Sequence, residues 1–211
     1  KLLIDPETGS IQSLFDKQIQ HEYVKQNSTY ALNSYRYLLG DDAANKAFVP
    51  KDVRITVKEN GPLLVSLLIE SQAEGCKWLK REVRLYADQA WVDIRNTIDK
   101  ISTRNKEGIH FGFAFNIPGA TTRMDIPWGI MIPEYDQIPG SNKNWFAFQH
   151  WIDISNADFG VTWTSPSSPL VEFGDLTANI LGVAMDEKQW KKKTEHTETV
   201  FSWALNIHWL L

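Results

Sequence analysis

The stretch His110-Phe111-Gly112-Phe113-Ala114-Phe115-Asn116-Ile117 decides the expected fold of this 211-residue chain. Its large apolar residues occupy every second position, which is the period of a β-strand. The residues between the rings are small or polar, so neighbouring layers are expected to pack closely on the second side of the strand as well. The pattern therefore predicts a strand that is buried on both faces.

Other period-two runs, such as Asp52–Glu59 and Trp91–Ile98, are separated by turn-forming residues, as at Asn60-Gly61-Pro62. Many short strands with turn signals between them are typical of an all-β antiparallel sandwich or barrel. Little helix is expected, because only Asp186–Lys193 could form two helical turns, and a charged loop fits it equally well. The last run is expected to turn an apolar face to the core, made of Phe201, Trp203, Leu205, Ile207 and Trp209.

The whole chain, residues 1–211, is expected to form a single β-sandwich domain, because no flexible linker or change in composition divides it. It opens without a methionine at Lys1 and stops inside an alternating apolar run at Leu211. Both features favour a fragment of a longer, multidomain chain.

Composition argues against several classes of function. Lysine and arginine total 22 against 26 aspartate and glutamate residues, a net charge of −4, and a nucleic-acid partner would favour a basic face. No apolar run approaches the roughly 18 residues of a membrane span, and no signal peptide is visible, so we expect no membrane partner and leave the cellular location open. The single cysteine, Cys76, allows neither an intrachain disulfide nor a cysteine-based zinc site.

Motifs for catalysis are missing from the sequence. The five histidines are scattered, none lies in a His-x-Asp or His-Glu-x-x-His pattern, and there is no Gly-x-Ser-x-Gly elbow. Glu134 and Asp136 have the spacing to share a strand face, but such pairs are ordinary on solvated strands. No catalytic residue and no metal ligand is therefore predicted in this chain.

The nine tryptophans suggest binding instead, because a flat ring can stack on the apolar C–H face of a sugar. Several gather near Pro118–Asn144, the least regular part of the chain, which could alternatively cover an open sheet edge. A face with tryptophan and polar residues suits a sugar platform, and a contact with another domain fits it somewhat better. The residues predicted to bind substrate are Trp128, Tyr135, Trp145, Trp151 and Asp153.

Five segments together resemble the β-domain that follows the catalytic part of glycoside hydrolase family 38 α-mannosidases. Ile4–Lys17 is similar to the opening strand, turn and Gly-x-Ile-x-Ser-Leu segment of that domain. Four further segments are similar to the same domain in bacterial members of the family: Asp125–Gly129, Asp136–Phe146, Gln149–Asn156 and Gly160–Trp163. The similarity spans nearly the whole chain, although these segments are not catalytic signatures.

The resemblance implies a large supersandwich of the galactose-mutarotase type that follows a β/α barrel and a helical segment. In that family the nucleophilic aspartate, the general acid and the zinc ligands lie mainly on the barrel, and none has a matching position here. The expected function is therefore a non-catalytic β-sandwich domain of an α-mannosidase-like hydrolase. It would support its own catalytic barrel, where zinc is expected, and shape a cleft for mannose-containing glycans.

Two alternatives remain open at this stage. The chain could be an autonomous carbohydrate-binding module that uses the tryptophans listed above. It could also be a mutarotase-like sugar epimerase, which needs a histidine base and a carboxylate, and His150 with Glu172 is the pair that could supply them.

Overall fold

The structure, a computed structural model, describes residues 1–40, 47–177, 188 and 190–207. These residues form sixteen β-strands and no α-helix. Of the expected helical turns at Asp186–Lys193, residues 188 and 190–193 are described and form no α-helix. The other three positions of that segment, and Trp209 at the end of the last strand, lie outside the described residues. The strands are β1 (Leu2–Ile4), β2 (Ile11–Asp16), β3 (His21–Glu22), β4 (Ser34–Leu39), β5 (Lys51–Asn60), β6 (Leu64–Gln72), β7 (Cys76–Tyr86), β8 (Val92–Lys100), β9 (Glu107–Ala114), β10 (Thr121–Ile126), β11 (Gly129–Met131), β12 (Phe146–Ala147), β13 (Ile152–Ser155), β14 (Gly160–Trp163), β15 (Leu170–Phe173) and β16 (Thr199–Ile207).

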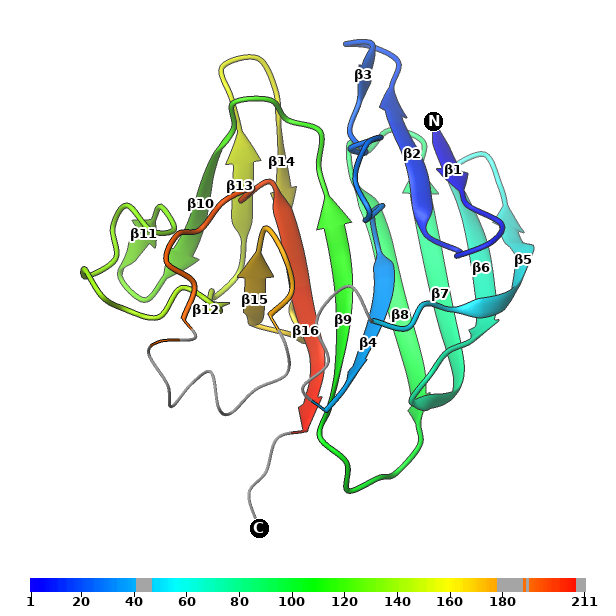
Figure 1. The fold of residues 1–211 in the computed structure, drawn as a ribbon. Helices are drawn as coiled ribbons and strands as arrows, with labels where there is room; N and C mark the ends of the chain where they lie inside the picture. The colour runs from blue at the N-terminus through cyan, green and yellow to red at the C-terminus, as the bar shows by residue number, and fades with distance from the viewer. Residues whose placement is uncertain (41–46, 178–187, 189, 208–211) are drawn as a thin grey trace.

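The strands form four antiparallel sheets (Figure 1), with the orders β1-β2-β3, β11-β10-β13-β14, β12-β15-β16-β9-β4 and β5-β6-β7-β8. The all-β, antiparallel prediction is therefore confirmed. Because the strands are divided among several small sheets, a single large sandwich of the galactose-mutarotase type stays a prediction.

The predicted double-faced strand is β9, at the centre of the molecule in Figure 1. It pairs with β16 on one side and with β4 on the other, and all eight of its residues are buried. A Cβ atom on Gly112 would lie 2.8 Å from Cε1 of Phe201, so only glycine fits at this crossing. The small residues between the rings thus serve the close packing that the sequence indicated.

One hydrophobic cluster joins all four sheets. Burial of each large apolar side chain in such a cluster contributes roughly 1.5–3 kcal/mol to stability. Its members include Ile11 of β2, Ile69 of β6, Leu79 of β7, Phe111 of β9, Met124 of β10, Ile152 of β13 and Val171 of β15.

The predicted core face of the last strand is only partly correct. Phe201 pairs with Gly112 and Trp203 with His110, so both point to the side opposite Phe111, away from the main core. The register shifts between Trp203 and Leu205, and Leu205 packs against the main cluster. A β-bulge inserts one residue and so exchanges the two faces, which an alternating sequence pattern does not reveal.

A buried arginine fastens the N-terminal turn to β7. Arg81 is fully buried and donates from Nη2 to the carbonyl of Thr8 at 2.7 Å and from Nη1 to the carbonyl of Asn33 at 3.5 Å. Burial lowers the pKa of Arg81 to about 10, although the charge of Asp5 opposes this. The turn can approach so closely because Gly9 has no side chain and adopts a φ of 67°.

Gly9→Ala is expected to destabilise the protein, because the new Cβ would lie 2.1 Å from Nη2 of Arg81 and 2.6 Å from Cγ2 of Ile69. Overpacking should lower the free energy of unfolding by about 1–3 kcal/mol, in addition to the cost of placing an alanine in the left-handed backbone conformation. Gly119→Ala is the matched control, since Gly119 has a φ of 66° and no atom within 4 Å of its added Cβ. Urea unfolding measures both, and equal losses would contradict the close approach.

Candidate functional site

Two of the predicted binding residues are freely accessible. Trp128 lies at the turn between β10 and β11, where Ile126 pairs with Gly129, and its side chain is completely exposed. Its φ of 68° is unusual for a bulky residue, which fixes the direction in which the ring leaves the turn. Tyr135 follows in the next loop and is also largely exposed. The β10–β11 end of the molecule (left in Figure 1) therefore offers two aromatic rings to a partner.

Trp145 and Trp151 do not share a strand face, because the segment between them passes from one sheet to another. Trp145 precedes β12 in the five-stranded sheet, and its ring centroid is 6.0 Å from that of Trp203. Trp151 precedes β13 in the sheet of β10. Both side chains are partly exposed. The apolar side chains of the same stretch are buried, at Phe146, Phe148, Ile152 and Ile154.

Asp153 has an ordinary surface partner. It lies on β13 opposite Arg123 of β10, and Nη1 of Arg123 is 3.3 Å from its Oδ2. Ser155 donates to the same oxygen at 2.6 Å. All three side chains are partly exposed, so this group could contact a ligand at the edge of the aromatic end.

The irregular segment Pro118–Asn144 is held in place by contacts to Glu134. Nζ of Lys143 lies 2.9 Å from Oε1 of Glu134, and the backbone N–H of Thr194 donates to Oε2. Burial acts to raise the pKa of Glu134, but these donors outweigh it and lower the pKa. Asp136 instead accepts the N–H of Ile132 at 2.7 Å within a turn, so the two acids do not form a catalytic pair on a strand.

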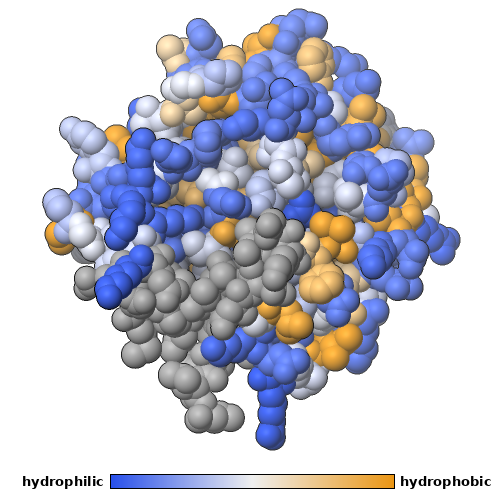
Figure 2. Space-filling view, in the orientation of Figure 1, coloured by the Kyte–Doolittle hydropathy of each residue, from blue (hydrophilic) through white to orange (hydrophobic). Residues whose placement is uncertain are grey.

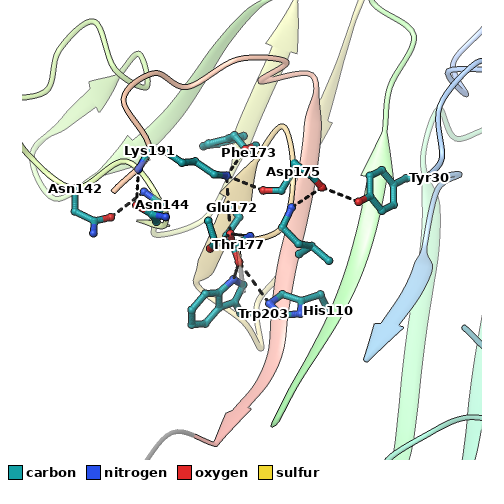
Figure 3. Close-up of polar contacts among 11 residues, drawn as sticks. Tyr30, His110, Asn142, Asn144, Glu172, Phe173, Asp175, Thr177, Lys191 and Trp203 are labelled. Atoms are coloured by element: carbon teal, nitrogen blue, oxygen red, sulfur yellow. Dashed lines mark hydrogen bonds and ion pairs between the residues drawn. The ribbon is translucent and has the colours of Figure 1, made fainter. Parts of the chain in front are cut away.

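A buried polar network covers the outer face of the five-stranded sheet (Figure 3). Oε1 of Glu172 on β15 accepts Nε1–H of Trp203 on β16 at 2.8 Å, and Nε2 of His110 on β9 lies 3.5 Å from the same oxygen. Oε2 accepts both the backbone N–H and the hydroxyl of Thr177. Glu172 and His110 are fully buried, so these donors replace the water that the carboxylate loses.

Lys191 connects this network to the loops. Its Nζ donates to the carbonyls of Phe173 at 3.1 Å and Asp175 at 2.6 Å and lies 4.0 Å from Oε2 of Glu172. Its backbone N–H donates to Oδ1 of Asn144 at 3.1 Å. Burial lowers the pKa of the ammonium group, although the two acidic side chains oppose this. One lysine thus holds the loop before β12 against β15.

The Glu172 network has a structural role, which is to hold the neighbouring loops in place. Its carboxylate, on Glu172, and its imidazole, on His110, are buried and so cannot meet a ligand from solvent. It also contains several buried polar atoms with no hydrogen-bond partner among the described residues, and such atoms are rare in native structures. The sequence did not predict the roles of His110 and Lys191. A histidine that alternates with phenylalanines looks like an ordinary strand position, and a run of lysines is typical of a solvent-exposed surface. The unpartnered atoms are both ring nitrogens of His110, Oγ of Ser141, Nδ2 of Asn142, Nδ2 of Asn144 and Oγ1 of Thr194.

The histidine–carboxylate pair predicted for an epimerase is wrong. Glu172 lies on β15, whereas His150 lies in the bend before β13, and the two side chains have different partners. Nδ1 of His150 lies 2.7 Å from Oδ2 of Asp125, and His110 is the imidazole that faces Glu172. The sequence does not reveal this pairing, because 25 residues separate His150 from Asp125, while the acid closest to it in the sequence, Asp153, pairs with Arg123.

The described residues contain neither a metal-binding cluster nor a membrane-spanning helix. No group of three or more histidine, cysteine, aspartate or glutamate side chains there could hold a metal ion. No helix in that part of the chain is long and apolar enough to cross a membrane.

The sheets and their loops define an all-β domain whose aromatic end is held by buried polar contacts. Residues 1–168 match the family described as "Glycosyl hydrolases family 38 C-terminal domain". The chain therefore belongs to this family, which confirms the resemblance found in the sequence. No curated protein matches the chain. The match ends before β15, so Glu172 and Lys191 lie beyond it.

Glu172→Ala is expected to destabilise the protein strongly, because it leaves the Thr177 donors and the Trp203 N–H without their acceptor and removes the carboxylate that pairs with the Lys191 ammonium. Loss of one partner from a buried charge pair typically costs about 3–5 kcal/mol. Glu70→Ala is the control, since Glu70 pairs with Lys80 at the surface at 2.9 Å, and it should cost far less. Equal effects in urea unfolding would show that the network does not stabilise the fold.

Asp125 should make the stability depend on acid pH. Burial acts to raise its pKa, but the N–H groups of Trp151, His150 and Gln149 and the ring of His150 together lower it to about 2. A carboxyl whose pKa is depressed in the folded state stabilises the protein above its unfolded value, 3.8, and loses this contribution as the pH falls through 2. The stability difference between wild type and Asp125→Asn should therefore shrink from pH 5 to pH 2. A difference that stays constant in denaturant titrations would contradict the assignment.

Proposed function

We propose that this chain is the non-catalytic β-domain of a family 38 glycoside hydrolase of the α-mannosidase type. Its role is to support the catalytic barrel of the same protein and to shape the cleft for mannose-containing glycans. The family match over residues 1–168 is the observation that carries this proposal. The large mutarotase-like sandwich belongs to the same proposal.

The cleft-shaping surface is the β10–β11 end of the domain. Trp128 and Tyr135 expose ring faces that can stack on sugars, and Asp153, Trp145 and Trp151 supply polar or partly exposed groups nearby in the chain. The Glu134–Lys143 ion pair and the Lys191 contact to Asn144 support this assignment, because they hold the loop behind the rings in one conformation.

The nucleophile, the general acid and the zinc ion belong to the catalytic part of the protein in this proposal. The residues of this chain supply neither the chemistry nor the ligands for them. Their part is to bind and orient the substrate beside that catalytic part.

An assay of the full-length protein and of the 211-residue chain, each with 4-nitrophenyl α-mannoside and zinc, tests the proposal. The full-length protein should turn over, and the chain should not exceed a purified blank. Inactivity of the full-length protein on α-mannosides, or turnover by the chain alone, would overturn the proposal. An autonomous carbohydrate-binding module, which the exposure of Trp128 also favours, would instead give heat when the chain alone is titrated with millimolar mannosides.

A further inference from the structure

His150 is an exposed side chain that is nevertheless fixed. Its side chain is 77% exposed, while its Nδ1 is held 2.7 Å from Oδ2 of Asp125. Asp125 is itself mostly buried, and its Oδ1 accepts the N–H groups of Gln149 at 3.2 Å, His150 at 2.8 Å and Trp151 at 2.9 Å. Three backbone N–H groups therefore fix the carboxylate of Asp125, and this carboxylate in turn fixes the exposed ring of His150.

The geometry decides which face of the imidazole a ligand would meet. An ionised carboxylate can only accept, so the ring nitrogen beside it, Nδ1, carries the proton. In the neutral imidazole Nε2 is then an acceptor, and it bonds no other described residue. A carboxylate behind a histidine is a common way to fix the orientation of the ring.

The strand that holds His150 through Asp125 also leads to an exposed aromatic ring. The carbonyl of Asp125 accepts the N–H of Gln149 at 3.1 Å, so the bend at 149–151 is joined to the end of β10. Trp128 lies three residues beyond Asp125 at the turn that follows this strand, and Gln149 is also exposed. A ring face, an acceptor and an amide match the apolar face and the hydroxyl groups of a sugar.

A different surface suits a protein contact better. Leu2, Val57, Val65 and Leu85 line an apolar groove between β1 and the β5–β7 sheet, with a volume of about 270 Å³. Figure 2 shows hydrophobic residues on the right-hand side of the molecule, where β5 and β6 lie, while the β11 side on the left is largely hydrophilic. The mixed polar and aromatic character of the His150 end favours a hydroxyl-rich ligand over a protein surface.

We propose that Nε2 of His150 accepts a hydrogen bond from a hydroxyl group of the glycan, at the end of the domain where Trp128 is also exposed. Asp125 is the positioning residue that sets the tautomer and direction of the ring. This inference rests on the proposed function, because it needs a glycan in the cleft that the domain shapes. It assigns substrate recognition in this chain to a specific imidazole.

The test compares full-length protein variants with an α-linked manno-oligosaccharide as substrate. His150→Gln should raise KM about fivefold to tenfold with kcat nearly unchanged, as expected when one hydrogen bond to the ligand is lost. Asp125→Asn should raise KM in the same direction, because it removes the group that orients the ring. His196→Gln is the matched control, since His196 is also exposed and lies 3.4 Å from a carboxylate oxygen, Oε1 of Glu198. It should leave KM unchanged.

The outcomes separate the two proposals. An active wild type with the same KM in His150→Gln overturns the role of His150 and leaves the proposed function standing. A wild type that cleaves no mannoside overturns both. If His150→Gln lowers the melting temperature of the full-length protein without a change in KM, the imidazole contacts protein and the glycan assignment is wrong. Because His150 is exposed, the glutamine variant should fold, and its melting temperature checks this directly.

Discussion

The pairing of β9 with β16 is the constraint on which the rest of the structure depends. The paired residues of these strands lie 85 or more positions apart in the sequence, and the pairing runs from Ala114 to Glu107 with one shift of register after Trp203. On one side their side chains complete the core that joins all four sheets, and on the other they carry His110 and Trp203. The close approach of Gly112 to Phe201 leaves little freedom to shift this register. Sliding the strands by one residue would exchange the two faces, placing the buried polar groups in the core.

Side chains on the outer face of β9 and β16 are connected by polar contacts to the loop between β11 and β12. Glu172 is buried there, and an unpaired carboxylate would be costly, so the segments around Thr177 and Lys191 must close over it. Lys191 then fixes Asn144, and Thr194 and Lys143 fix Glu134. The loop between β11 and β12 is thus anchored from behind. The hydrogen bonds that satisfy one buried carboxylate are thus connected to the contacts that anchor the loop carrying Tyr135.

The sequence predicted the features that depend on the alternation of apolar residues, but not those that depend on which residues meet in the folded chain. Alternating phenylalanines predicted β9 and its burial on both faces, and the family resemblance was confirmed. The bulge after Trp203 was not foreseeable, because one inserted residue exchanges faces without altering composition. His150 was assigned to Glu172, whereas the fold gives it Asp125, since only strand order brings residues 25 positions apart together. Trp145 and Trp151 looked like one platform because a sequence does not show where a chain leaves one sheet for another.

The central claim is that the ordered β10–β12 end of this domain faces the glycan in the full-length enzyme. Hydrogen–deuterium exchange of that enzyme, with and without an α-linked manno-oligosaccharide, tests it most directly. The account predicts slower exchange on ligand binding in the peptides that carry Trp128, Tyr135 and His150, and unchanged exchange along β5 and β6. Unchanged exchange at 125–151, or protection confined to β5 and β6, would contradict it.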